Sequence, residues 1–222
     1  MSEVLGAVDV ASRRYRAVVF DQDGTLINTF IPAMHAYSVA VGREITLAEL
    51  EPVAHLGAAR NLVSALLGHE ATDTDDDAFH DALADAVARV EPYPGIPELL
   101  VALRSAGVAT AVATNSDARS ATVVLAAHGL DALFDTVVTV DLGSGPKPNP
   151  EMIHLAVERL GVPASLVVFV GDSPGDMVAA RAAGVLAVAA GWGHQTPGIP
   201  SQDIDVLAPA PADVARLVLG GT

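Results

Sequence analysis

The chain has 222 residues, which suffice for one hydrophobic core with a small insertion but hardly for two independent full-size domains. Its 12 basic and 27 acidic residues give a formal net charge of −15, which argues against general electrostatic attraction to nucleic acids or anionic membrane surfaces. The absence of cysteine excludes a disulfide framework, a thiolate metal site and a cysteine nucleophile.

Short β-branched runs alternate with longer alanine- and leucine-rich segments, a pattern typical of βαβ units around a parallel sheet. Buried strands are predicted at residues 16–21, 108–114, 136–140, 166–171 and 185–190. Helices between them are predicted at residues 96–106, 118–128, 150–160 and 174–183. The sequence therefore predicts an α/β fold with a parallel sheet flanked by helices.

The alternation fails at residues 27–93, where helical patterns occur without a convincing strand. Four helices are predicted there, at residues 32–41, 46–53, 58–67 and 77–90. The aspartate-rich run 72–77 lacks the glycine and the distal glutamate of a calcium loop, so we expect a solvated inter-helix loop with a helix N-cap. We predict a core domain of residues 1–26 and 94–222 and an inserted helical cap domain of residues 27–93.

Polar residues gather where the predicted strands end, which is where ligands bind in open parallel sheets. They are Asp21 and Asp23, Thr114 and Asn115, Lys147 on a proline-rich loop, and Asp172 and Asp176. Lys147 is the only lysine, against eleven arginines, which suggests a requirement for a compact point charge. Converging carboxylates repel each other unless a cation lies among them, and all-oxygen ligands favour a hard ion, Mg²⁺ first.

The segments 21–26 (DQDGTL), 114–115 (TN), 147–148 (KP) and 171–176 (GDSPGD) resemble, in this order, the four motifs of the haloacid dehalogenase-like (HAD) superfamily. The helical insertion between the first two segments also resembles that family. The resemblance implies a Rossmann-like parallel-sheet core with an inserted α-helical cap. It is greatest to the subgroup that includes phosphoglycolate phosphatases and β-phosphoglucomutase.

The resemblance implies a role for each acidic residue. Asp21 would be the nucleophile that forms an aspartyl-phosphate, and Asp23 would be the general acid and base. Mg²⁺ would be held by the carboxylates of Asp21 and Asp172 and by the main-chain carbonyl of Asp23.

Phosphate binding is carried over from the family in the same way. Thr114 and the Asn115 amide would bind phosphoryl oxygens, and Lys147 would neutralise charge on the nucleophile and the transferring group. Asp176 would orient Lys147 or the metal shell; the alternative is an ordinary acidic residue in the first turn of a helix.

Three features refine the resemblance. Gln22 occupies the variable position of the first motif, and we expect its side chain to point away from the site. The presence of Asp23 points to phosphoryl chemistry and away from the dehalogenases, which lack that residue. The predicted cap contains no lysine, which argues against a phosphonoacetaldehyde hydrolase-like activity that needs a Schiff-base lysine there.

Substrate selectivity in the family lies mostly in the cap. Arg60, in a glycine-containing loop, is a candidate to bind a substrate carboxylate or second phosphate, or else a solvent-facing helix residue. His35 and His55 are cap candidates with the same alternative. Trp192 follows the fifth predicted strand and could line the entrance or pack the loop.

The sequence predicts an enzyme, a Mg²⁺-dependent phosphatase that hydrolyses a small phosphorylated metabolite, with a phosphoglycolate-like anion as the first expectation. A phosphomutase or a pyrophosphatase of the same fold remains open, as does a non-catalytic phosphate-binding regulatory protein. We expect no nucleic-acid or membrane partner. The absence of a signal-peptide pattern and of a long apolar run predicts a soluble, cytoplasmic protein. Oligomeric state is not indicated by the sequence.

Overall fold

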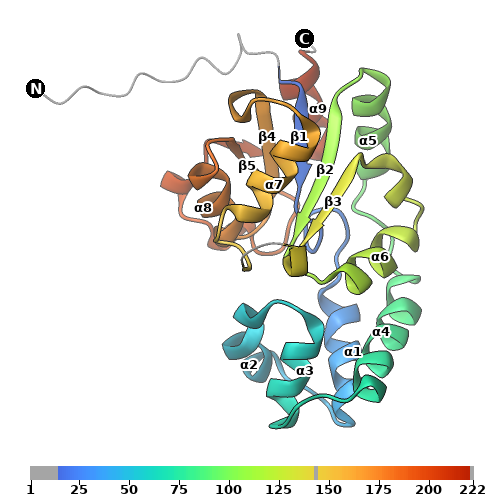
Figure 1. Ribbon diagram of the computed structural model, residues 1–222. Helices are drawn as coiled ribbons and strands as arrows, with labels where there is room; N and C mark the ends of the chain where they lie inside the picture. The colour runs from blue at the N-terminus through green and yellow to red at the C-terminus, as the bar shows by residue number, and fades with distance from the viewer. Residues whose placement is uncertain (1–14, 143–144, 221–222) are drawn as a thin grey trace, which may run out of the picture.

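The computed structural model describes residues 15–142 and 145–220 (Figure 1). Within these residues, six parallel strands form one sheet in the order β3-β2-β1-β4-β5-β6. The strands are β1 Ala17–Phe20, β2 Ala109–Thr114, β3 Thr136–Thr139, β4 Val167–Gly171, β5 Leu186–Ala190 and β6 Val206–Ala208. The predicted α/β fold is confirmed, and β6 adds a sixth strand to the five that were predicted.

Helices cover both faces of the sheet, as Figure 1 shows. On one face lie α5 Ile96–Ser105, α6 Ala118–Ala126 and α9 Pro211–Leu219, and on the other lie α7 Glu151–Leu160 and α8 Pro174–Ala182. Alternate residues of β1 supply the two cores, because successive side chains of a strand point to opposite faces. Val18 and Phe20 pack on the first side, and Ala17 and Val19 on the second.

A separate group of helices lies beyond the carboxyl ends of the strands (Figure 1). It contains α1 Phe30–Val41, α2 Leu47–Leu50, the 3₁₀ helix η2 Glu51–Leu56, α3 Ala59–Leu67 and α4 Asp73–Val87. The ring centroids of Tyr37 on α1 and Phe79 on α4 lie 4.6 Å apart. We call this group of helices the cap.

Two segments connect the cap to the sheet and run side by side. Ile27 and Pro92 form an antiparallel bridge, and the amide of Tyr93 donates to the Leu26 carbonyl at 2.9 Å. We retain residues 27–93 as the proposed cap domain.

Two local predictions in the cap were wrong. The aspartate run is not an inter-helix loop: α4 begins at Asp73, capped by Thr72, and acidic side chains in its first turn interact favourably with the helix dipole. The helix predicted at 46–53 ends earlier, because α2 stops at Leu50 and the chain continues through Pro52 as η2. Within the described residues, helices are too short or too polar to cross a membrane.

Candidate active site

Lys147 and two carboxylates form a buried ionic cluster at the carboxyl ends of β1 and β4. The ammonium of Lys147 lies 2.5 Å from Asp21 Oδ1 and 2.6 Å from Asp176 Oδ1. It also lies 5.4 Å from the centroid of the Phe169 ring on β4. Burial alone would lower the pKa of Lys147, but the carboxylates of Asp176 and Asp21 outweigh it and raise the pKa above the ordinary value for lysine. The lysine therefore remains a cation in this buried place.

Asn115 fixes the loop that carries Lys147. Its Oδ1 accepts from the amide of Lys147 at 2.7 Å, and its Nδ2 donates to the Lys147 carbonyl at 3.4 Å. Asn115 follows β2 directly, so the pairing of β2 with β1 in the sheet fixes the position of Lys147 relative to Asp21. The Asn115 side chain thus contacts the Lys147 main chain, and phosphoryl binding by the Asn115 amide stays a prediction.

Asp23 has different surroundings from Asp21, although it lies only two positions further along the chain. Its Oδ1 accepts from Thr29 Oγ1 at 2.7 Å, and its Oδ2 accepts from Ser116 Oγ at 2.8 Å and from Thr114 Oγ1 at 3.3 Å. Hydroxyl groups, in place of a lysine, therefore orient this half-buried carboxylate.

Gln22 corrects one expectation. Its side chain is fully buried, and Nε2 lies 3.3 Å from both carboxylate oxygens of Asp23. It therefore points toward the site. Because β1 ends at Phe20, the alternation of side chains along the strand no longer sets its direction.

Asp172 is held in a narrow space at the end of β4. A Cβ added to Gly24, whose φ is +91°, would lie 2.5 Å from Asp172 Oδ2. A Cβ added to Gly193 would lie 2.2 Å from Asp172 Cβ. Asp172 Oδ2 accepts from the amide of Gln195 at 3.2 Å and lies 3.5 Å from His194 Nδ1, whereas Oδ1 is buried without a hydrogen-bond partner among the described residues.

The donor set fits a hard divalent cation. Oxygens of Asp21, Asp172 and Asp176 lie within 4.8 Å of one another, and a carboxylate oxygen without a donor is a natural cation ligand. Burial raises the pKa of Asp172 to about 6, and burial also raises the pKa of Asp21 against the opposing effect of Lys147. Three carboxylates share one ammonium, so a bound cation would relieve the excess negative charge. Asp21 and Asp176 each contact Lys147 as well.

The structure thus brings together most of the residues singled out in the sequence at one edge of the sheet. They are Asp21, Asp23, Thr114, Asn115, Lys147, Asp172 and Asp176. Two residues that hold Asp23 had no role assigned from the sequence, namely Thr29 and Ser116. Ser116 directly follows the TN motif, so its place among the polar residues at a strand end was visible in the sequence, whereas Thr29 gave no such signal.

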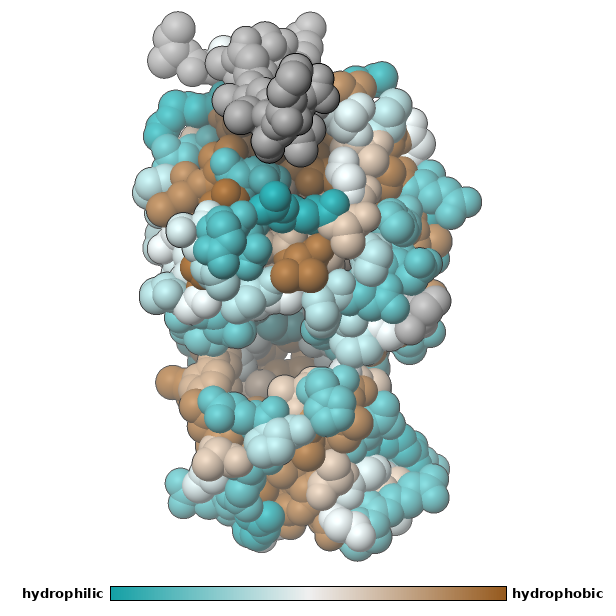
Figure 2. Space-filling model, turned by 90° about the vertical axis from the view of Figure 1, so that its left-hand side faces the viewer, coloured by the Kyte–Doolittle hydropathy of each residue, from teal (hydrophilic) through white to brown (hydrophobic). Residues whose placement is uncertain are grey.

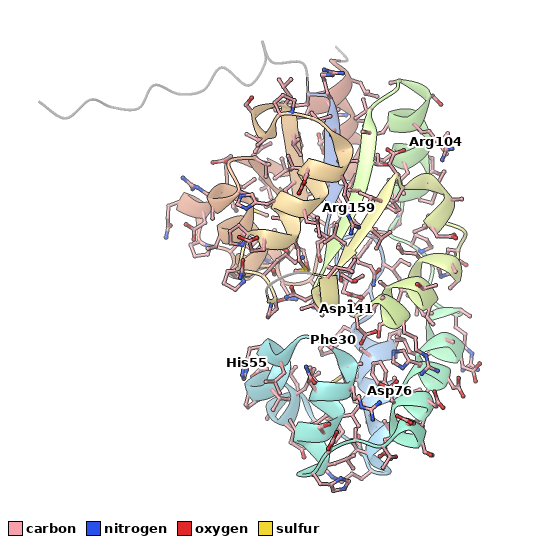
Figure 3. All side chains as sticks on the ribbon, viewed as in Figure 1. Phe30, His55, Asp76, Arg104, Asp141 and Arg159 are labelled. Carbon is pink, nitrogen blue, oxygen red and sulfur yellow. The ribbon has the colours of Figure 1, made fainter. Side chains whose placement is uncertain are left out.

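The cap candidates lie elsewhere. Arg60 contacts Asp73 Oδ1 at 2.9 Å and the Ala71 carbonyl at 2.9 Å, and so is held between α3 and the start of α4. His35 and His55 are exposed, and Figure 3 shows His55 at the outer edge of the cap. Trp192 donates from Nε1 to the Thr25 carbonyl at 2.9 Å, which assigns it to packing of the loop.

A second contact region, also missed in the sequence, joins the cap to the core. Asp117 at the start of α6 accepts from the Ala59 amide at 2.9 Å and from the Ser120 amide at 2.8 Å. The buried His80 of α4 places Nε2 3.4 Å from Asp117 Oδ1. One carboxylate therefore caps the core helix and binds the cap at two points.

Comparisons with known proteins agree with this geometry. Residues 15–184 match the model of a family described as haloacid dehalogenase-like hydrolase. The N-acetylmuramic acid 6-phosphate phosphatase of Pseudomonas aeruginosa is 32% identical over 192 residues, covering 83% of this chain and 85% of that protein. A phosphoglycolate phosphatase of Xylella fastidiosa is 32% identical over 193 residues, covering 82% of each. The crystal structure of CbbY from Rhodobacter sphaeroides with phosphate has a TM-score of 0.78 at 22% identity, covering 90% of this chain and 96% of that one.

Proposed function

The chain belongs to the haloacid dehalogenase-like hydrolase family and is a phosphatase, and on that premise we propose a Mg²⁺-dependent reaction through an aspartyl-phosphate on Asp21. The substrate is a small phosphomonoester. The observation that supports this proposal best is the contrast between the two neighbouring carboxylates. Asp21 contacts a buried ammonium, and Asp23 is held by hydroxyl groups. Such different surroundings suit a nucleophile and a proton-transfer group, respectively.

In the first step, a carboxylate oxygen of Asp21 attacks phosphorus, and the bond from phosphorus to the ester oxygen breaks. Asp23 gives its proton to the departing oxygen, which leaves as an alcohol. Lys147 lies against the attacking carboxylate and offsets the repulsion between that carboxylate and the negatively charged phosphoryl group. In the second step, Asp23 takes a proton from water, the water oxygen attacks phosphorus, and inorganic phosphate leaves as Asp21 is restored.

The residues that would hold Mg²⁺ are Asp21, Asp172 and the main-chain carbonyl of Asp23. The ion would offset the repulsion between a carboxylate and an approaching phosphate dianion. Asp176 keeps the lysine in place, and Asn115 keeps the loop of that lysine in register.

Phosphate release from p-nitrophenyl phosphate, with Mg²⁺ and with a chelator, tests the proposal. Asp21→Asn should reduce turnover by about 10⁴-fold or more, because it removes the nucleophile. Asp131→Asn is the matched control, since this carboxylate is exposed and away from the site. Acid quenching of the wild type with ³²P-labelled substrate should trap labelled protein that hydroxylamine releases. Turnover by Asp21→Asn close to the wild-type value would overturn the assignment, and net sugar-phosphate interconversion without phosphate release would indicate a phosphomutase.

A further inference from the structure

A cavity of about 220 Å³ lies between the cap and the sheet, and Asp23 is on its wall. Figure 2 shows the molecule hollowed at this level, with hydrophobic residues inside the hollow. In Figure 3, Phe30 lies at the same boundary, where α1 begins. Because Asp23 is the proposed acid for the departing oxygen, the cavity is the place where the alcohol part of the substrate lies. We call it the leaving-group cavity.

The wall of the leaving-group cavity is mainly apolar. Much of it comes from buried side chains of α1, α3, α4 and α6, namely Tyr37, Leu62, Phe79, Leu83 and Val124. Such a wall favours an apolar occupant.

Arginine and lysine are absent from this wall as far as the structure describes the chain. Arg60 is held by Asp73 and Ala71, and Lys147 is held by Asp21 and Asp176. His194 is on the wall, but its Nδ1 lies 3.5 Å from Asp172. A carboxylate or second phosphate in the cavity would lose its hydration without gaining a cation, and it would face Asp23.

The hydroxyl groups on the wall are mostly engaged. Thr29 and Ser116 donate to Asp23, and Ser120 Oγ lies 3.2 Å from His80 Nε2. Tyr37 also lines the wall, and burial raises the pKa of its hydroxyl, so the hydroxyl stays neutral and can donate to a substrate oxygen. Asn115, also on the wall, is engaged with the Lys147 main chain. Tyr37, Gln195 and His194 therefore remain to bind substrate oxygens, which is too few for the several hydroxyls of a sugar.

The volume limits the size of the group. A dry cavity of about 150 Å³ is known to hold benzene, so the leaving-group cavity has room for about one ring with a short substituent. A nucleoside is larger than this volume and would extend out of the cavity into solvent.

We infer that the substrate is the phosphate monoester of a neutral, mainly apolar alcohol of about one ring in size. The inference rests on the proposed phosphatase function and narrows it. Carboxylate-bearing esters such as phosphoglycolate and doubly phosphorylated esters are poor substrates.

The test compares kcat/KM for benzyl phosphate, phosphoglycolate and glucose 6-phosphate with Mg²⁺. Benzyl phosphate should exceed each of the other two by about tenfold or more, as expected for a difference in apolar contact and desolvation. A kcat/KM for phosphoglycolate or glucose 6-phosphate equal to or above that of benzyl phosphate would overturn the inference and leave the phosphatase proposal standing.

A binding measurement separates the inference from the chemistry. Benzylphosphonate and phosphonoacetate cannot be hydrolysed at their carbon–phosphorus bonds, so calorimetry with the wild-type protein and Mg²⁺ reports binding without chemistry. Both carry the same phosphonate, so the difference between their affinities reflects the cavity. Benzylphosphonate should bind at least about tenfold more tightly than phosphonoacetate. If benzylphosphonate binds more tightly but no phosphate ester is hydrolysed, only the proposed phosphatase function is refuted. If the two phosphonates bind with equal affinity, the inference about the substrate is refuted.

A charge introduced at the rim should reverse the preference. Ala54 is exposed and lines the leaving-group cavity, so Ala54→Arg adds a cation without filling the buried part. The ratio of kcat/KM for phosphoglycolate to that for benzyl phosphate should rise by about tenfold. Ala48→Arg makes the same change on an exposed cap residue outside the cavity and should leave the ratio unchanged. An unchanged ratio in Ala54→Arg would count against the inference.

Discussion

Asp176 Oδ1 lies 2.6 Å from the Lys147 ammonium, while Oδ2 of the same carboxylate accepts from the Ser173 amide at 3.0 Å and its hydroxyl at 2.7 Å. One side chain therefore joins the start of α8 to the lysine that faces Asp21. Asp176 could cap α8 without contacting Lys147, and it could contact Lys147 without capping a helix. The combination fixes the lysine through a rigid helix terminus.

Asp176→Asn should lower kcat/KM by about 10- to 100-fold, because the amide keeps the size of the side chain but removes the charge that holds Lys147. Steady-state kinetics and thermal melts would measure the two effects separately. Asp213→Asn is the matched control: Asp213 occupies the same position in α9 and accepts from the Ala210 amide at 2.9 Å, away from the site. Equal losses of activity in both variants would show that only capping matters.

Gly24→Ala should raise the Mg²⁺ concentration that gives half-maximal activity by about tenfold or more. The new Cβ would lie 2.5 Å from Asp172 Oδ2, and the φ of +91° is unfavourable for alanine, so Asp172 must shift. A Mg²⁺ titration of phosphate release measures the effect. Gly198→Ala is the control, because nothing lies within 4 Å of its added Cβ. An unchanged Mg²⁺ dependence in Gly24→Ala would argue against Asp172 as a ligand.

The fold was largely predictable because buried parallel strands leave a strong local signal. Each of the five predicted strands overlaps an observed one. The sixth, Val206–Ala208, has only three residues between Asp205 and Pro209, too few to show a strand pattern. It exists because its neighbour β5 offers a free edge, which is a tertiary property.

The residues of the candidate site could be predicted where they lie at the ends of strands or in a distinct motif, as Asp21, Lys147 and Asp172 do. It was not predictable where a side chain from another part of the chain decides the contact. Thr29, at the start of the cap, donates a hydrogen bond to Asp23. Arg60 donates to Asp73, thirteen positions away. Neither contact has a spacing that a linear pattern could reveal.

Thr29→Val should reduce kcat by about tenfold with little change in KM, because Asp23 loses its 2.7 Å hydrogen bond and with it part of its orientation. Stopped-flow and steady-state measurements would locate the loss in proton transfer. Thr139→Val is a suitable comparison: this threonine is buried, and its hydroxyl has no hydrogen-bond partner among the described residues. It should keep full activity and equal or greater stability. A large rise in KM for Thr29→Val would instead indicate a role in binding.

His80 should make the stability of the folded protein depend on pH. Burial would lower its pKa, but hydrogen bonds and charge from Asp117 and Asp76 outweigh this and raise the pKa above the ordinary value of 6.5. Arg119, the nearby cation, contacts Asp76 Oδ2 at 3.2 Å. Because the folded-state pKa is the higher one, the stabilisation is fully present below about pH 6.5 and is lost as pH rises through the folded-state value.

His80→Gln should therefore lower the melting temperature more at about pH 5.5 than at about pH 8.5. A charge-assisted hydrogen bond contributes about 2 kcal/mol, which corresponds to about 4–8 °C at the lower pH for a chain of this size. Differential scanning calorimetry at both pH values measures the difference. His154→Gln is the control, since His154 is exposed on α7 and its Nδ1 lies 3.9 Å from Glu151. Only a proton gained on folding makes the contribution of His80 to stability vary with pH. An equal loss of melting temperature in His80→Gln at both pH values would therefore show that the histidine acts through packing and neutral hydrogen bonds alone.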